Sequence, residues 1–183
     1  MQIGVPKETA PRERRVALAP DSVARLVKGG AQVIVERGAG AAASFADAAY
    51  VASGATIAGP AEAFAADVVT KVQRPSAAEA KSMKVDALLI SLLQPAASAD
   101  LLPVLAERRV TALSLERVPR ITRAQSMDVL SSQSTVAGYK AVLLGASLMP
   151  KFLPMLTTAA GNIAPAKTFV ILSICHSLSL FLK

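Results

Sequence analysis

Short apolar runs alternate with helical stretches along the first two-thirds of the chain. The apolar runs are rich in Val, Ile and Leu with little strict alternation, which is typical of strands buried on both faces of a sheet. The strands that this pattern predicts are Gln2–Pro6, Gln32–Glu36, Asp67–Val72, Ala87–Leu93 and Val110–Leu115. The helices that it predicts between them are Pro20–Lys28, Ala46–Ser53, Pro60–Ala65, Ser76–Lys81 and Ala99–Arg108.

This order of elements predicts an α/β fold with a doubly wound parallel sheet, Rossmann-like or flavodoxin-like, whose crossovers are right-handed. Pro20 suits the first turn of a helix, and Gly29-Gly30 suits a helix end. We expect this first lobe to occupy residues 1–130.

The rest of the chain has a different organisation. A longer helical pattern runs from Ser132 to Leu148, and Thr157–Ala166 has the composition of a linker. We expect residues 131–166 to connect two lobes. The apolar run that begins at Lys167 predicts the first strand of a second lobe, so that residues 167–183 hold only its beginning.

Composition and charge exclude several classes of protein. The net charge is +7, but the basic residues are scattered and aromatic residues make up only 4%, so we do not expect nucleic-acid binding. Cys175 is the only cysteine, which excludes an internal disulfide, and with its neighbour His176 it supplies too few ligands for a structural zinc site. The N-terminus lacks the pattern of a signal peptide. The apolar stretch Thr168–Leu182 is shorter than the roughly 20 residues that span a membrane.

The most polar stretch of the chain is Arg120–Gln133, which combines guanidinium, amide, carboxylate and hydroxyl groups within an otherwise aliphatic sequence. Such a stretch is poor core material, because each buried polar group needs a partner. It is suited to bind a polar ligand, such as a carboxamide with neighbouring phosphates.

Two stretches resemble a known family. Gly4-Val-Pro-Lys-Glu with Glu13-Arg-Arg-Val-Ala-Leu-Ala-Pro resembles the opening of alanine dehydrogenases and of the α subunit of proton-translocating NAD(P) transhydrogenase. Pro119–Gln133, continuing into Val136-Ala-Gly-Tyr-Lys-Ala-Val, resembles the transhydrogenase branch more specifically. The resemblance covers about residues 1–170. It implies that this loop lies over the nicotinamide of NAD(H), while NADP(H) is bound on a partner domain.

The resemblance assigns roles to five residues. Arg120, Gln125 and Asp128 match the loop of the family, and Ser131 and Tyr139 follow as further cofactor contacts. Direct hydride transfer needs two nicotinamide rings held close together and no acid or base. An arginine can donate to pyrophosphate or carboxamide oxygens, a carboxylate and a hydroxyl can bracket the carboxamide, and the glutamine can reach toward the NADP(H)-bearing domain.

Local structure offers an alternative interpretation of the same residues. Thr122 and Gln125 fit the spacing of a capping box, so Gln125 could serve only to start a helix. Asp128 could pair with Arg123 on one helix face.

Three other positions can be compared with the alanine dehydrogenase branch of the family. Arg15 and Lys71 match residues that hold the substrate of alanine dehydrogenases, but we favour a role as salt-bridge partners. Where those enzymes have a histidine, this sequence has Gln94, which leaves no general acid or base for an amino-acid substrate. The sequence therefore argues against an alanine dehydrogenase.

The family's NAD-binding lobe begins with a strand and a glycine-rich turn that binds pyrophosphate. This sequence has no glycine after Gly161 and no acidic residue that would bind the ribose. We therefore expect the second lobe to be missing after its first strand, through a frameshift or a truncated gene copy. We do not expect the chain alone to bind NADH.

The leading hypothesis is the N-terminal part of a transhydrogenase α subunit, which passes hydride from NADH to NADP⁺ coupled to proton translocation. The resemblance implies membrane and NADP-binding partner subunits, a homodimer, and a place on the cytoplasmic side of the inner membrane. A non-catalytic fragment that pairs with intact subunits is the alternative. An enzyme related to alanine dehydrogenase and a chain anchored to the membrane by its tail are weaker alternatives.

Overall fold

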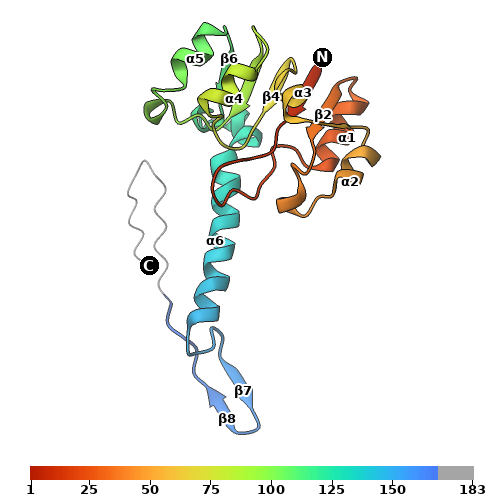
Figure 1. Ribbon diagram of the computed structural model, residues 1–183. Coiled ribbons are helices and arrows are strands. Elements are labelled where there is room, and N and C mark those ends of the chain that lie inside the picture. Colours follow the sequence, from red (N-terminus) through yellow and green to blue (C-terminus); the bar gives the residue numbers. More distant parts are fainter. Residues whose placement is uncertain (169–183) are drawn as a thin grey trace. The chain divides into compact units, whose positions relative to one another are not determined.

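The computed structural model describes residues 1–168. The chain divides into two compact units, one of Met1–Leu130 and one from Ser131 onward. The first unit is a six-stranded parallel sheet with helices on both faces (Figure 1). No helix among the described residues is long and apolar enough to cross a membrane.

The sheet of the first unit is built from β1 Gln2–Val5, β2 Gln32–Glu36, β3 Thr56–Ala58, β4 Val68–Thr70, β5 Leu88–Ser91 and β6 Thr111–Ser114. The α-helices between these strands are α1 Pro20–Lys28, α2 Asp47–Ala52, α3 Pro60–Phe64, α4 Ala77–Ser82 and α5 Leu102–Glu107. Short 3₁₀ turns lie at Ala41–Ala43, Pro95–Ala97, Leu115–Arg117 and Thr122–Met127.

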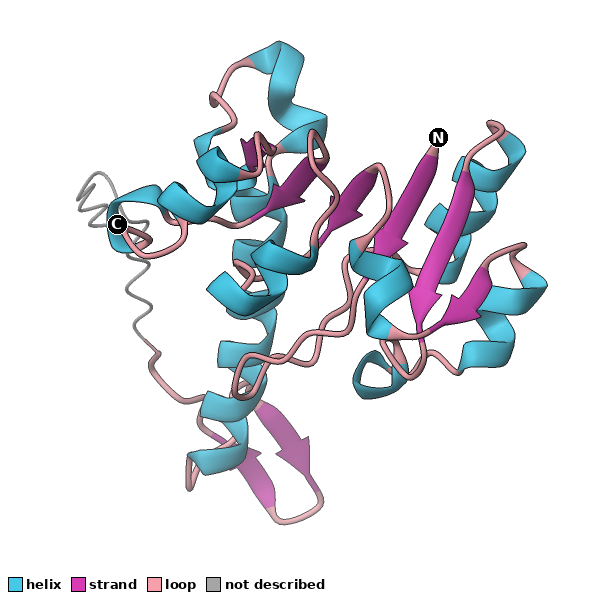
Figure 2. Cartoon of the chain, turned by 45° about the horizontal axis from the view of Figure 1, so that its top comes forward, coloured by secondary structure: helices cyan, strands magenta, loops and turns pink. Residues whose placement is uncertain are grey.

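The strands lie in the order β3-β2-β1-β4-β5-β6 (Figure 2). The chain therefore moves outward from β1 to β3, returns to the other side of β1, and moves outward again to β6. All five pairings are parallel, so the carboxyl ends of the strands share one edge. The direction of winding changes between β1 and β4, and ligands of doubly wound sheets bind in the crevice at such a switch point.

Each face of the sheet has its own apolar core. Side chains of β1 and β2 such as Val5 and Val35 pack with Val23 of α1 and Tyr50 of α2. The opposite face carries a core of Phe64, Val69, Ala80, Met83, Ala87, Leu89, Leu93, Leu101 and Leu105, which α3, α4 and α5 cover. The two helix layers are the arrangement that the doubly wound prediction requires, and that prediction is confirmed.

At Gly4, β1 and α3 come very close together. A Cβ added to Gly4 would lie 1.8 Å from the carbonyl oxygen of Ala63 and 3.0 Å from the Cβ of Ala66. The obstacle is backbone, which cannot rotate away as the end of a side chain can. Only glycine therefore lets α3 rest on the centre of the sheet.

The second unit contains most of α6, Val129–Leu148, and an antiparallel hairpin of β7 Leu156–Thr158 and β8 Gly161–Ile163. Gly161 has a φ of +118° at the turn of the hairpin, a conformation that favours glycine. The predicted linker over Thr157–Ala166 contains most of this hairpin, in which Leu156 pairs with Ile163 and Thr157 with Asn162.

The strands of the first unit follow the sequence predictions to within two residues at their ends, with one omission. β3 has only three residues between Gly54 and Gly59, too few to show a pattern of its own. α5 is shorter than predicted, beginning at Leu102, and α6 begins three residues earlier than predicted, at Val129. The residues from Phe169 onward lie outside the described part of the chain. They include most of the strand predicted from Lys167, the Cys175-His176 pair and nearly all of the apolar tail.

We expect Gly4→Ala to lower the free energy of unfolding by at least about 3 kcal/mol, because the new methyl group forces β1 and α3 apart. Urea unfolding followed by circular dichroism measures this loss. Gly59→Ala is the matched control, since its Cβ meets only the end of the flexible Glu62 side chain, and we expect it to lose less than about 1 kcal/mol. Equal losses of unfolding free energy in Gly4→Ala and Gly59→Ala would contradict the close contact between β1 and α3.

Candidate functional site

The candidate cofactor loop, Arg120–Asp128, follows β6 and its 3₁₀ turn at the carboxyl edge of the sheet. It contains the 3₁₀ turn Thr122–Met127, in which the side chain of Ala124 is buried. Arg120 and Gln125 are exposed, and Asp128 is half-buried. The two long polar side chains of the loop are therefore accessible, as a role in ligand binding requires.

Two large apolar side chains of this loop are exposed beside the polar ones. Ile121 is 56% exposed and Met127 is 57% exposed. Exposed apolar side chains can contact the face of a flat ring, and a neighbouring guanidinium and amide can form hydrogen bonds with polar groups at its edge.

The capping interpretation of this loop is wrong. The residue that precedes the 3₁₀ turn is Ile121, and in this described turn no side chain caps the first N–H groups. Gln125 therefore does not begin a helix as part of a capping box, and α6 begins after Asp128.

The two remaining candidates lie on α6. Ser131 is the third residue of the helix, and Tyr139, near the middle of the helix, is 70% exposed. Ser131 and Tyr139 are eight residues apart, which is about 12 Å along a helix axis. They are thus too far apart to contact one small ring together, although both can contact an extended dinucleotide.

Glu116 braces the base of the loop, and the sequence analysis missed it. Its carboxylate accepts hydrogen bonds from the backbone N–H groups of Leu93, at 3.2 Å, and Gln94, at 2.5 Å. Burial raises the pKa of Glu116, but the hydrogen bonds to its carboxylate outweigh burial and the pKa lies below its ordinary value. The charged carboxylate therefore ties the end of β5 to the turn from which the candidate loop departs.

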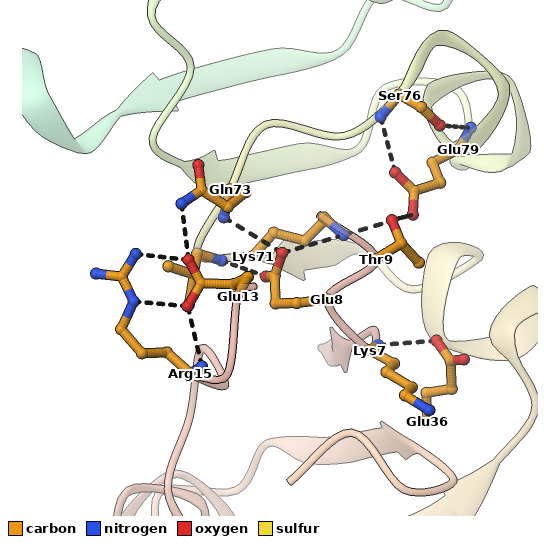
Figure 3. A network of polar contacts seen from close by, with 11 residues as sticks. Lys7, Glu8, Thr9, Glu13, Arg15, Glu36, Lys71, Gln73, Ser76 and Glu79 are labelled. Carbon is orange, nitrogen blue, oxygen red and sulfur yellow. Dashed lines mark hydrogen bonds and ion pairs between the residues drawn. The ribbon is translucent and has the colours of Figure 1, made fainter. Parts of the chain in front are cut away.

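A buried ion cluster occupies the switch point between β1 and β4 (Figure 3). The ammonium of Lys71, whose side chain is 1% exposed, lies 3.5 Å from the carboxylate of Glu8 and 3.5 Å from that of Glu79. It also lies 5.7 Å from the centre of the Phe64 ring. Two carboxylates of the protein itself therefore neutralise the buried lysine.

A second pair extends the cluster along the same edge. The Arg15 guanidinium donates to both oxygens of Glu13, at 2.8 and 2.6 Å, and the amide of Gln73 donates to Glu13 at 2.7 Å (Figure 3). The Arg15 guanidinium lowers the pKa of Glu13 to about 2, against the opposing effect of burial.

Arg15 and Lys71 are thus salt-bridge partners, as we favoured from the sequence. Their acidic partners were missed, although Glu8 and Glu13 lie in a stretch that carries the family resemblance. Glu8 and Glu79 are far from each other in sequence, and only the parallel sheet brings both to Lys71. No spacing rule could have found this cluster.

Gln94 has a left-handed backbone, with φ +47° and ψ +61°. A residue with a side chain adopts this conformation at a cost of about 1 kcal/mol or more, and the hydrogen bond from its N–H to Glu116 helps to hold it. An amide has no proton to exchange at neutral pH, so Gln94 cannot act as a general acid or base.

Residues 1–168 contain no group of three or more histidine, cysteine, aspartate or glutamate side chains that could hold an ion. The carboxylates at the carboxyl edge are instead bound to Lys71, Arg15 and backbone N–H groups.

We expect acid to weaken the fold partly through Glu13. Because its pKa is lower in the folded protein, the stabilisation that it provides is complete above pH 4.5 and is lost as the pH falls toward about 2. In urea unfolding, the stability of wild type should exceed that of Glu13→Gln by about 1 to 2 kcal/mol at pH 5, and by much less near the lowered pKa. Glu107→Gln, which removes an exposed carboxylate, is the control. A difference in stability between wild type and Glu13→Gln that does not change with pH would contradict the ion pair between Glu13 and Arg15.

Known proteins resemble this chain closely. Residues 4–137 match the family model described as alanine dehydrogenase/PNT, N-terminal domain. The chain is 48% identical to the first portion of the NAD(P) transhydrogenase subunit alpha of Rhodospirillum rubrum over 177 residues, which is 93% of this chain and 46% of that protein. It is 37% identical to the alanine dehydrogenase of Bacillus subtilis, over 82% of this chain and 39% of that enzyme.

Solved structures give the same result. The crystal structure of transhydrogenase from Sinorhizobium meliloti matches with a TM-score of 0.87 and 41% identity, over 91% of this chain and 50% of that one. An L-alanine dehydrogenase matches with a TM-score of 0.74 and 38% identity, over 80% of this chain and 40% of that one. The chain spans about half the length of these relatives or less. The family model covers well over half of the chain, and this chain therefore belongs to the alanine dehydrogenase/PNT N-terminal domain family.

Proposed function

We propose that this chain is the N-terminal lobe of an NAD(P) transhydrogenase α subunit, which passes hydride from NADH to NADP⁺ coupled to proton translocation. The observation that carries the proposal is the candidate cofactor loop, which presents Arg120 and Gln125 to solvent beside the exposed Ile121 and Met127. The higher identity to transhydrogenase subunits than to alanine dehydrogenases supports the same branch.

The chemistry of the loop fits the nicotinamide end of NAD(H). A carboxamide offers two N–H donors and one carbonyl acceptor. Asp128 can accept from its amide, while Ser131 and the fork of Arg120 can donate to its oxygen. The apolar side chains of Ile121 and Met127 are suited to the face of the ring, and their contact would exclude water from the reacting carbon.

Hydride transfer between two nicotinamides requires no proton donor in the protein. NAD(H) supplies the hydride and NADP⁺ accepts it, so the task of this lobe is to fix the position and the exposed face of the first ring. The absence of histidine from residues 1–168 and the amide at Gln94 suit this task. In the proposal, Gln125 points toward the partner that binds NADP(H), and Tyr139 contacts a more distant part of NAD(H).

The pyrophosphate of the cofactor needs a further site. The sequence contains no glycine-rich turn after Gly161, so we propose that residues 1–168 position the ring and that a second lobe supplies most of the affinity. The partners in this proposal are the membrane and NADP-binding subunits of the transhydrogenase, and the lobe acts at the cytoplasmic side of the inner membrane.

A chimera tests the proposed function. Residues 1–168 of this chain replace the matching residues of the Rhodospirillum rubrum α subunit, and hydride transfer from NADH to an NADP⁺ analogue is measured with the partner subunits added. We expect an active chimera and a rate about a hundredfold lower in its Arg120→Ala variant, because a group that orients the ring is lost. Arg123→Ala removes a neighbouring exposed arginine of the same turn and is expected to keep the rate.

The control for the chimera is the chain alone. We expect it to give no hydride transfer, and no rise in melting temperature with millimolar NADH, since it lacks the pyrophosphate turn. An inactive chimera that still folds would contradict the proposed function. Equal losses in the Arg120→Ala and Arg123→Ala chimeras would contradict the assigned role of Arg120.

A second candidate function is pairing with another α subunit. The C-terminal half of α6 is rich in exposed apolar side chains, and Val142, Leu144 and Leu148 are 51%, 52% and 83% exposed. A helix that is apolar all round is normally buried against other structure. This surface suits a homodimer, or a complex in which the chain pairs with an intact subunit without catalysing a reaction.

Pairing predicts that a charge on α6 separates the chains. We expect a tagged copy of this chain to capture an intact α subunit when the two are expressed together, and Leu144→Glu with Leu148→Glu to reduce the captured amount at least about tenfold, because charges would be buried in the contact. Lys140→Gln, on the same helix, is the control and should not change capture. Capture that survives the double glutamate variant would exclude α6 as the contact.

A further inference from the structure

The loop between β1 and α1, residues 6–19, contains a tight turn at Ala10–Glu13. The N–H of Glu13 donates to the carbonyl oxygen of Ala10 at 3.1 Å, and Arg12 has a φ of +65°. Proline keeps φ negative at Pro11, so the positive φ of the next residue makes this a type II turn, in which glycine is favoured at that place. An arginine there holds backbone strain that a glycine would not.

The side chain of Arg12 has no partner in the described part of the chain. It is exposed and makes no hydrogen bond or ion pair with residues 1–168. Arg109 has the same left-handed backbone, with φ +53°, but its guanidinium donates to both carboxylate oxygens of Asp86, each at 2.7 Å. An internal ion pair therefore explains the side chain of Arg109 and not that of Arg12. A strained residue of this kind points to a contact with another molecule.

The exposed charges of this loop are all positive. Its two acids, Glu8 and Glu13, have side chains that are only 3% and 7% exposed, and they are paired with Lys71 and Arg15 (Figure 3). Three cations of the loop are exposed and form no ion pair within residues 1–168: Lys7, Arg12 and Arg14. We call these three residues the basic surface.

Hydrogen bonds to the rest of the unit hold the basic surface in a fixed arrangement. The N–H of Lys7 donates to Glu36 at 2.8 Å, and the Nε of Arg14 donates to the carbonyl oxygen of Ala42 at 3.3 Å. A protein partner with charges at fixed positions gains affinity from such preorganisation. A fluid lipid surface needs only positive charge near it, and gives no reason for a strained turn. The basic surface therefore favours a protein as its partner.

The basic surface and the candidate cofactor loop leave the same edge of the sheet. The first follows β1 and the second follows β6, and all the strand pairings are parallel. β4 and β5 lie between these strands, so the two strand ends are about 14 Å apart at the usual strand spacing. An interface of standard size covers about 800 Å² on each partner, which is a patch roughly 30 Å across. One docked protein can therefore contact both loops.

We propose that Lys7, Arg12 and Arg14 form part of the surface on which the partner that binds NADP(H) docks, and that Arg12 is kept in its strained turn for this contact. The inference rests on the proposed function, in which that partner must bring its nicotinamide to the candidate cofactor loop. NADP(H) carries a 2′-phosphate and a pyrophosphate, so the loaded partner brings negative charge that the three cations attract. The complement of the basic surface is an anionic face around the bound nucleotide.

Arg12→Gly tests the proposal, because it relieves the strain and removes the contact. We expect this variant of the full chain to melt about 2 to 4 °C higher than wild type. Association is measured by biolayer interferometry with the NADP-binding subunit of the Rhodospirillum rubrum transhydrogenase, loaded with NADP⁺. At low ionic strength the association rate should be at least about threefold lower in Arg12→Gly than in wild type. The rate of wild type should fall as sodium chloride is added.

Arg109→Gly is the matched control. It also removes one positive charge and one left-handed arginine, but at the amino edge of the sheet, before β6. We expect it to associate at the rate of wild type. Equal losses in the two glycine variants would reveal an effect of net charge alone and would overturn the docking surface. An unchanged rate in Arg12→Gly, or no binding by wild type at low ionic strength, would overturn it as well.

Two further outcomes decide the rest of the proposal. A melting temperature of Arg12→Gly at or below that of wild type would overturn the strain at the turn. Binding to phosphatidylglycerol vesicles that Arg12→Gly weakens, with no binding to the NADP-binding subunit, would identify a membrane surface in place of the partner. Melting and association are measured without hydride transfer. They can therefore fail while the chimera of the proposed function is active, and an inactive chimera does not change their outcome.

Discussion

The buried ammonium of Lys71 is the constraint on which the carboxyl edge of this lobe depends. A charge that is 1% exposed must be paired, and removing one partner of a buried pair costs about 3 to 5 kcal/mol. Its two acids come from different parts of the chain, Glu8 after β1 and Glu79 at the start of α4. The lysine thereby fixes the first crossover loop to the central strands, and the Glu13–Arg15 pair continues the same attachment through Gln73.

The two polar clusters of this edge lie apart. The Glu8 carboxylate holds its loop at the end of β4, next to the switch point. The candidate cofactor loop instead departs from β6, two strands away from β4, which corresponds to about 10 Å at the usual strand spacing. Glu116 fixes this departure point by binding the N–H groups that follow β5.

The sequence predicts the fold far better than it predicts the site. Five strands and five helices of the first unit follow from local apolar patterns, because a strand buried on both faces is a continuous run of Val, Ile and Leu. β3 was missed because three residues carry no pattern, and the hairpin after α6 was taken for a linker because Thr and Ala are common in both. The acidic partners of Lys71 and Arg15 were missed for another reason. Glu8 and Lys71 meet only after the sheet has formed, so no local spacing in the sequence indicates their contact.

The polar groups at the switch point and those of the candidate cofactor loop differ in their exposure to solvent. At the switch point the charges of Lys71 and Glu8 are buried and neutralised within the protein. Around Arg120 and Gln125 the polar groups are accessible and stand beside apolar side chains, which suits holding a ring. An amino-acid dehydrogenase needs a proton donor near its substrate, whereas transfer of hydride between two nicotinamides needs position alone. The accessible polar groups around Arg120 and Gln125 suit the second task.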